Sequence, residues 1–220
     1  MAGRLALIGG SSLSDGELPT GDWEALQRHG PPGRYVLPHL IDHAANLRLL
    51  AAAGCDRVLA VSSVGGLRVE LGPGVMICPD DFISLDATPL TALAGSSAHR
   101  VPGFDSQWRL EVVAALAAAA VDVTEGGVYW QAAGPRLETP AEIRFVAAHA
   151  DVIGMTVASE CIVAGELGLR YAALCVVDNL ANGVGETELT LDQIDRDRAA
   201  NRAAVEGALA AILPRLAQSR

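Results

Sequence analysis

Short apolar runs alternate along this sequence with longer segments rich in alanine and leucine. Residues 4–8 are followed by Gly-Gly-Ser-Ser, residues 57–61 by Ser-Ser-Val-Gly-Gly, and residues 171–177 by Asp-Asn. Between such runs lie segments with helical periodicity, for example residues 38–53 and 108–120. Strands that alternate with helices and end in polar turns are typical of a layered α/β domain. The pattern therefore predicts one α/β layer sandwich.

The size and charge of the chain narrow the possibilities further. It has 220 residues, half of them hydrophobic, which is enough for one large α/β domain with a sizeable core. It contains no internal repeat and no linker, so we expect a single domain over residues 1–220. The formal net charge is −10 and all 16 basic residues are arginine. An acidic chain without a basic run is not expected to bind nucleic acid or an anionic membrane, although it can hold a local arginine pocket for phosphate.

The four cysteines, Cys55, Cys78, Cys161 and Cys175, lie far apart and show neither a CxxC pair nor the Cys/His spacing of a zinc site. We expect them to be buried, reduced thiols of a cytoplasmic protein, and we expect no metal. The chain begins with a strand-like run, and no apolar stretch is long enough to cross a bilayer, so no membrane segment is expected.

The most informative stretch is residues 134–142, with the sequence Gly-Pro-Arg-Leu-Glu-Thr-Pro-Ala-Glu. It places the carboxylate of Glu138 in a Gly/Pro-rich turn directly after a strand-like run. A second turn, which ends in the hydroxyl of Thr156, follows the next apolar run. Between them, Thr139 with Glu142 three residues later predicts a capping box at the start of a helix. Two polar loops after two buried strands are what a small-molecule site in an α/β domain needs.

Two glycine-containing turns and an arginine–histidine pair are candidates for anion binding. The glycines at 9–10 and 65–66 follow strands, and each pair predicts either a nest of backbone amides for an anion or a plain strand-to-loop turn. Neither matches GxGxxG or a P-loop with lysine, so dinucleotide or triphosphate binding does not follow. Arg28 and His29 end a polar segment, residues 15–33, that is rich in glycine and proline. An arginine there can pair with a phosphate or simply be solvated.

Taken together, these motifs resemble the trimeric branch of the purine nucleoside phosphorylases, which includes the methylthioadenosine and methylthioinosine phosphorylases. The matching stretches span most of the chain in the same order: residues 9–11, 28–30, 60–66, 134–142, 154–156 with Glu160, and 176–183. The resemblance implies a single-domain, three-layer α/β/α sandwich with a central mixed sheet. It also implies a homotrimer that takes a purine nucleoside, uses inorganic phosphate as co-substrate and needs no cofactor.

In this family, phosphate and the purine lie on opposite sides of the ribosyl group that passes between them. The resemblance assigns phosphate binding to hydroxyls and to the arginine–histidine pair: Ser11, Arg28, His29, Ser62, Ser63 and Thr156. Charge-assisted contacts to a phosphate dianion are strong, and they also align the nucleophile.

The catalytic residues that the resemblance implies, Glu138 and Asn179, both contact the purine. Glu138 corresponds to the carboxylate that accepts the N1 proton of a 6-oxopurine. Asn179 falls where adenine-specific members carry aspartate, and its amide can donate to O6 or N7 as negative charge builds on the leaving base. A shift of one residue would place Asp178 there and favour adenine. We expect a 6-oxopurine.

The remaining contacts assigned to the nucleoside are Met155 against the ribose, and Leu137, Ala181, Leu191 and Val101. Members that prefer a 5′-hydroxyl carry a histidine where this chain has Leu191, so an apolar contact would favour a 5′-methylthio group. Leu191 can equally be a core residue. Val101 is placed near the sugar because the segment around it usually reaches a neighbouring subunit.

The sequence departs from the family on the phosphate side. Only residues 12–27 separate Ser11 from Arg28, where the family has a longer hairpin region, and Gly33 replaces a histidine. The expected activity is phosphorolysis of methylthioinosine, inosine or guanosine. The alternatives are a methylthioadenosine phosphorylase, a nucleosidase, or a noncatalytic nucleoside-binding relative with a degenerate phosphate site.

Overall fold

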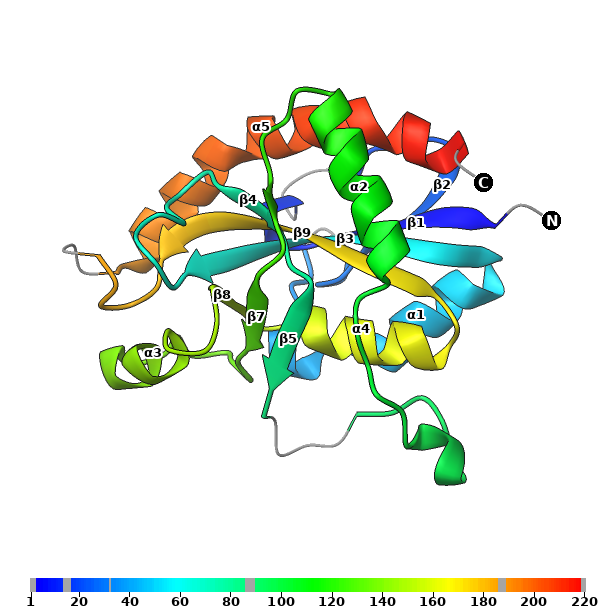
Figure 1. The fold of residues 1–220 in the computed structure, drawn as a ribbon, viewed down its shortest axis with the longest axis horizontal. Coiled ribbons are helices and arrows are strands. Elements are labelled where there is room, and N and C mark those ends of the chain that lie inside the picture. The colour runs from blue at the N-terminus through cyan, green and yellow to red at the C-terminus, as the bar shows by residue number, and fades with distance from the viewer. Residues whose placement is uncertain (1–2, 14–16, 32, 86–89, 186–188, 219–220) are drawn as a thin grey trace.

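The protein consists of a mixed sheet with helices on both faces (Figure 1). The computed structural model describes residues 3–13, 17–31, 33–85, 90–185 and 189–218. In chain order the strands are β1 (Arg4–Gly9), β2 (Trp23–Gln27), β3 (Cys55–Gly66), β4 (Met76–Cys78), β5 (Asp81–Ser84), β6 (Thr124–Glu125), β7 (Val128–Gln131), β8 (Val152–Gly154) and β9 (Arg170–Leu180). The helices are α1 (His43–Ala52), α2 (Ser106–Ala118), α3 (Pro140–Val146), α4 (Val157–Glu166) and α5 (Leu191–Gln218), with 3-10 turns at Ser11–Leu13, Pro38–Leu40 and Gly95–Ala98.

The long strands β3 and β9 are the centre of the sheet and pair in parallel along most of their length. The strand order is β5-β7-β8-β3-β9-β4-β6, and β1 pairs in parallel with both β3 and β2. Antiparallel pairing with β8 and β4 makes the sheet mixed. Both central strands are nearly continuous runs of buried residues, as expected for strands covered on both faces.

Alternate side chains of the central strands point into two separate cores. Val58 and Ala60 of β3 pack with the cluster that includes Leu47 of α1 and Cys161 of α4. Leu59 and Val61 join the opposite cluster, to which α2 and α5 contribute. Figure 1 shows α1 and α4 on one side of the sheet and α2 and α5 on the other. This period-two alternation confirms the three-layer α/β/α sandwich with a central mixed sheet.

The structure differs from the sequence-based prediction around two turns. The strand β2 lies within the segment predicted as a polar loop, residues 15–33, of which residues 15, 16 and 32 are outside the described part. The alternation between buried and exposed residues along β2 is weak, because all five residues are exposed or only partly buried. The strand β3 continues through Gly65 and Gly66, which pair with β8 and β9. The alternative of an anion nest at these two glycines is therefore wrong.

The predicted capping box and the predicted burial of the cysteines are confirmed. Thr139 and Glu142 form the capping box that begins α3: the Thr139 side chain accepts from the Glu142 amide, and the Glu142 carboxylate accepts from the Thr139 amide. The four cysteines are free and buried. In the part of the chain that the structure describes, no helix is long and apolar enough to span a membrane.

Candidate active site

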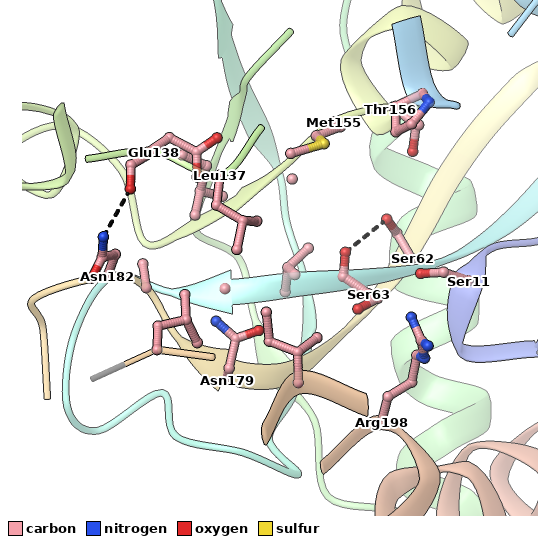
Figure 2. Close-up of a pocket in the computed structure, with 18 of the residues that line it drawn as sticks. Ser11, Ser62, Ser63, Leu137, Glu138, Met155, Thr156, Asn179, Asn182 and Arg198 are labelled. Carbon is pink, nitrogen blue, oxygen red and sulfur yellow. Dashed lines mark hydrogen bonds between the residues drawn. The ribbon is translucent and has the colours of Figure 1, made fainter. Parts of the chain in front are cut away.

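A cavity lies at the carboxyl ends of several strands, where polar turns from distant parts of the sequence meet. This is where ligands bind in open α/β sheets. Its lining includes every predicted site residue except Leu191 and Val101, namely Ser11, Arg28, His29, Ser62, Ser63, Leu137, Glu138, Met155, Thr156, Asn179 and Ala181. Figure 2 shows Glu138 and Leu137 at one end, and Ser11, Ser62 and Thr156 toward the other. The structure thus places the predicted purine contacts and the predicted phosphate contacts at different ends of one cavity.

Glu138 is held at its end of the cavity by its own backbone and by the start of α3. The Asn182 side chain, which sequence reasoning missed, donates to the Glu138 carbonyl oxygen at 3.1 Å and also lines the cavity (Figure 2). Thr139, the next residue, is fixed as the N-cap. Burial raises the pKa of the Glu138 carboxyl, and the neighbouring carboxylate of Glu142 adds to the effect.

Of two adjacent polar residues at the end of β9, only one lines the cavity. Asn179 lines it, and its amide donates to the Leu180 carbonyl at 2.9 Å. Asp178 is completely buried and does not line the cavity. Its carboxylate accepts hydrogen bonds from Ser63 and from Asn201, the latter at 3.0 Å. The register between β3 and β9 shifts here, because Val177 lies opposite Val64 whereas Asn179 lies opposite Gly65, and this leaves Asp178 as an extra residue in β9. Asn179 rather than Asp178 is therefore available to a ligand.

Arg28 does not reach the cavity as an unpaired cation. Its Nε lies 2.5 Å from Oε1 of Glu160 and its Nη2 lies 2.8 Å from Oε2, while Nη1 donates to the Val61 carbonyl at 3.0 Å. Both side chains of the ion pair are only 1% exposed. The carboxylate also accepts from the Tyr171 hydroxyl at 2.7 Å. Arg28 is therefore a fixed part of the cavity wall whose charge is matched by Glu160.

His29 is fixed in one tautomer by its backbone partner. Its Nδ1 lies 2.8 Å from the Val36 carbonyl oxygen, which can only accept, so Nδ1 carries the proton. The ring stacks on Tyr35 with centroids 4.6 Å apart. Burial lowers the pKa of His29, and the Arg28 guanidinium lowers it further, so the imidazole is neutral at pH 7.

The hydroxyl groups at this end differ in what they already bind. Ser63 donates to Asp178, and the Ser62 hydroxyl lies 3.4 Å from the Ser63 carbonyl. Thr156 is the N-cap of α4 but makes no side-chain capping bond; the N3 amide, that of Ser159, donates to the Gln131 side chain at 3.0 Å instead. The Thr156 hydroxyl is thus not used to begin the helix.

Tight packing joins the two most distinctive motifs. Gly134 has a φ of +66°, and a side chain there would place its Cβ 2.6 Å from the sulfur of Met155. The left-handed backbone favours glycine, and the absence of a Cβ lets the Met155 side chain pack against this position. The turn that carries Glu138 therefore rests directly on the turn that carries Met155 and Thr156.

The lining residues that were not predicted include Leu189, Ile194 and Arg198. Ile194 and Arg198 belong to α5, and Arg198 extends toward Ser11 and Ser63 in Figure 2. The sequence carries no local signal for them, because several arginines and aliphatic residues occur in the same long helix.

Two predicted contacts lie away from this cavity. Leu191 is 70% exposed, so the alternative that it is a core residue is wrong, and Leu189 and Ile194 stand nearer the site. Val101 is 98% exposed. Their predicted roles as nucleoside contacts are not supported by the cavity of a single chain and remain predictions. Among the residues described, no three His, Cys, Asp or Glu side chains cluster so that they could hold a metal ion.

Residues 9–214 match a family described as the phosphorylase superfamily. The chain is 38% identical over 188 residues to a protein of Archaeoglobus fulgidus named "Probable 6-oxopurine nucleoside phosphorylase", which covers 84% of this chain and 76% of the relative. It is 37% identical over 177 residues to a protein of Xanthomonas campestris pv. campestris named "Probable S-methyl-5'-thioinosine phosphorylase", covering 77% and 70%.

Solved structures support the same fold. A methylthioadenosine phosphorylase from Schistosoma mansoni in complex with adenine superposes with a TM-score of 0.84 at 20% identity, covering 99% of this chain and 93% of that one. The match over almost the whole sequence, together with the identity to these relatives, shows that this chain belongs to the phosphorylase superfamily, among the purine nucleoside phosphorylases.

Proposed function

We propose that this chain cleaves the N-glycosidic bond of a 6-oxopurine nucleoside with inorganic phosphate. The products are the free base and ribose 1-phosphate or its methylthio counterpart. The observation that carries the proposal is the placement of Asn179 in the cavity that Glu138 also lines, with Asp178 buried outside it. The relatives named as 6-oxopurine and methylthioinosine phosphorylases support the same class of substrate.

The purine end of the cavity offers complementary groups for a 6-oxopurine. The Glu138 carboxylate, when ionised, accepts the hydrogen bond from protonated N1. The Asn179 amide donates to O6 or N7. As the bond between C1′ and N9 breaks, its electron pair moves onto the purine, and a donor placed at N7 or O6 stabilises that charge in the transition state.

The phosphate end would supply the nucleophile. Ser11, Ser62 and Thr156 offer hydroxyl donors, and Arg28 offers the N–H bonds that Glu160 leaves available. One phosphate oxygen forms the new bond to C1′ on the face opposite the departing base. Holding phosphate in line with the bond that breaks, opposite the departing base, removes most of the entropic cost of bringing the two reactants together.

The wall near the start of α5 favours an apolar 5′ substituent. Leu189 and Ile194 line the cavity there. A hydroxyl against such side chains would lose hydrogen bonds to water, whereas a methylthio group would bury apolar surface. Methylthioinosine is therefore our preferred substrate, and inosine is the second candidate. A kcat/KM for methylthioinosine below that for inosine would overturn this preference.

We place the enzyme in the cytoplasm as a homotrimer. Four free cysteines suit a reducing compartment. The nearly complete exposure of Val101 is consistent with a segment that a neighbouring chain covers, as the family resemblance implies. Light scattering of the wild type and of Val101→Asp tests this. Monomers in the wild type would reject the trimer.

The activity is tested with a panel of nucleosides assayed for base release with and without phosphate. Phosphate-dependent release of hypoxanthine, with formation of the sugar 1-phosphate, is the expected result. Equal release without phosphate would identify a nucleosidase instead. Calorimetric binding of nucleoside without turnover would identify a noncatalytic binding protein, and a preference for methylthioadenosine would identify an adenine-specific enzyme.

A further inference from the structure

The arginine–histidine pair contributes little net positive charge to the phosphate end of the cavity. The Arg28 guanidinium is paired at two points with the buried carboxylate of Glu160. His29 donates from Nδ1 to a carbonyl, and its burial disfavours the imidazolium. A phosphate dianion needs compensating charge when it leaves water. This pair can orient a phosphate, but its charge is already balanced within the protein.

The nearby helix terminus does not replace that charge. Three amides at the start of α4 already have partners: Tyr129 accepts from Thr156 and Val157, and the Gln131 side chain accepts from Ser159 at 3.0 Å. These hydrogen bonds occupy three of the backbone donors that an anion would otherwise use at a helix N-terminus.

Arg198 is the second arginine among the described residues that line the cavity. It projects from α5 toward the region of Ser11, Ser62 and Ser63, from the side opposite Thr156 (Figure 2). Its side chain is 27% exposed, and its ion-pair partner on the same helix, Asp195, is 2.7 Å away and has a side chain that is 64% exposed. Such an exposed pair between residues three apart is weak and exchanges readily for a stronger anion.

We infer that Arg198 binds the phosphate co-substrate and supplies the net positive charge that the Arg28–Glu160 pair does not. The inference rests on the proposed phosphorolysis. In the bound state the guanidinium turns from Asp195 to the phosphate, where its planar fork matches two phosphate oxygens.

The test measures the KM for phosphate at saturating nucleoside in Arg198→Ala, with Arg196→Ala as the matched control. Arg196 lies two residues away on the same helix, is exposed, and donates to the Gln193 side chain at 2.9 Å. Loss of a charge-assisted hydrogen bond should raise the phosphate KM of Arg198→Ala by about 10- to 100-fold. The KM for nucleoside should change less than about threefold. Arg198→Lys keeps the charge but not the planar guanidinium, so its phosphate KM should lie between those of Arg196→Ala and Arg198→Ala.

Two further variants keep the test decisive. Arg198→Gln retains the length of the side chain and replaces Arg198→Ala should that variant fail to fold, as checked by circular dichroism. Asp195→Asn removes the competing carboxylate and should lower the phosphate KM. A phosphate KM in Arg198→Ala and Arg198→Gln equal to that of Arg196→Ala would overturn the inference. A wild type that releases base without phosphate would instead overturn the proposed function, so the two failures are distinguishable.

Discussion

Arg28 and Glu160, which lie 132 residues apart in the sequence, form a buried ion pair with two contacts of 2.5 and 2.8 Å. Tyr171 adds a third hydrogen bond to the same carboxylate. The pair connects the end of β2 to α4 and so fixes the phosphate side of the cavity to a helix of the core. Its geometry shows that the most recognisable cation of the site is also a structural residue.

Replacing Glu160 by glutamine should destabilise the fold strongly. The substitution keeps the shape but leaves the Arg28 charge buried without a counterion, which costs about 3–5 kcal/mol in comparable cases. The free energy of unfolding from urea denaturation measures the loss. Glu206→Gln is the control, because its exposed pair with Arg202 should contribute less than about 1 kcal/mol. Equal losses in the two variants would contradict a structural role for the buried pair.

The same pair predicts acid sensitivity. Burial alone would raise the pKa of Glu160, but the Arg28 guanidinium more than offsets it, and the pKa is lowered. A carboxyl with a lowered folded pKa contributes stability above its unfolded pKa, near 4.3, and loses it as the pH falls further. Unfolding free energy should therefore decrease below about pH 4 in the wild type and change less with pH in Glu160→Gln. Parallel pH profiles would disprove this link.

Glu138 should produce an acidic limb in the pH profile of activity. Only the ionised carboxylate accepts the N1 proton, and burial raises its pKa above the usual glutamate value. The kcat/KM for inosine should therefore rise with pH through that raised pKa. Glu138→Gln should remove the limb and lower kcat/KM by about 10- to 100-fold, as expected for a lost hydrogen bond to a charged group.

The stability of Glu138→Gln provides the control for this experiment. A carboxyl with a raised folded pKa is less favourable in the folded state once the pH exceeds that pKa. The variant should thus be at least as stable as the wild type at pH 7. A fall in activity accompanied by a clear fall in Tm would attribute the effect to folding instead of to purine recognition.

The capping box of α3 should couple stability to nucleoside binding. Thr139→Ala removes the cap next to Glu138 and should cost about 1 kcal/mol, with a higher KM for nucleoside. Asp105→Ala removes the cap of α2, where Asp105 accepts from the Trp108 amide at 2.8 Å, away from the cavity. It should lower Tm similarly without changing that KM. Equal changes in KM would show that the cap does not position Glu138.

The sequence predicted those parts of the fold and site that local patterns determine. The capping box and the turn with Glu138 lie within nine residues of Gly134, so their geometry follows from turn and cap chemistry. The central strands were recognisable as continuous apolar runs. By contrast, β2 is only half-buried and pairs along one edge, so its residues carry no strong period-two signal.

The unpredicted parts depend on tertiary packing. The pairing of Arg28 with Glu160 could not be derived from residues so distant in the chain. Likewise, Arg198 is one of several arginines on α5, and only the packing of that helix decides which one lines the cavity. The choice between Asp178 and Asn179 depends on the register shift of β9 against β3 at this position, for which the sequence carries no local signal.

The central claim is that Glu138 and Asn179 select a 6-oxopurine, and the ratio of kcat/KM for inosine to that for adenosine in wild type and Asn179→Asp tests it most directly. A carboxylate at this position would accept from the adenine amino group and repel O6 of hypoxanthine. The wild type should favour inosine, and Asn179→Asp should shift the ratio toward adenosine by about tenfold or more. An unchanged ratio in a folded, active variant would contradict the account.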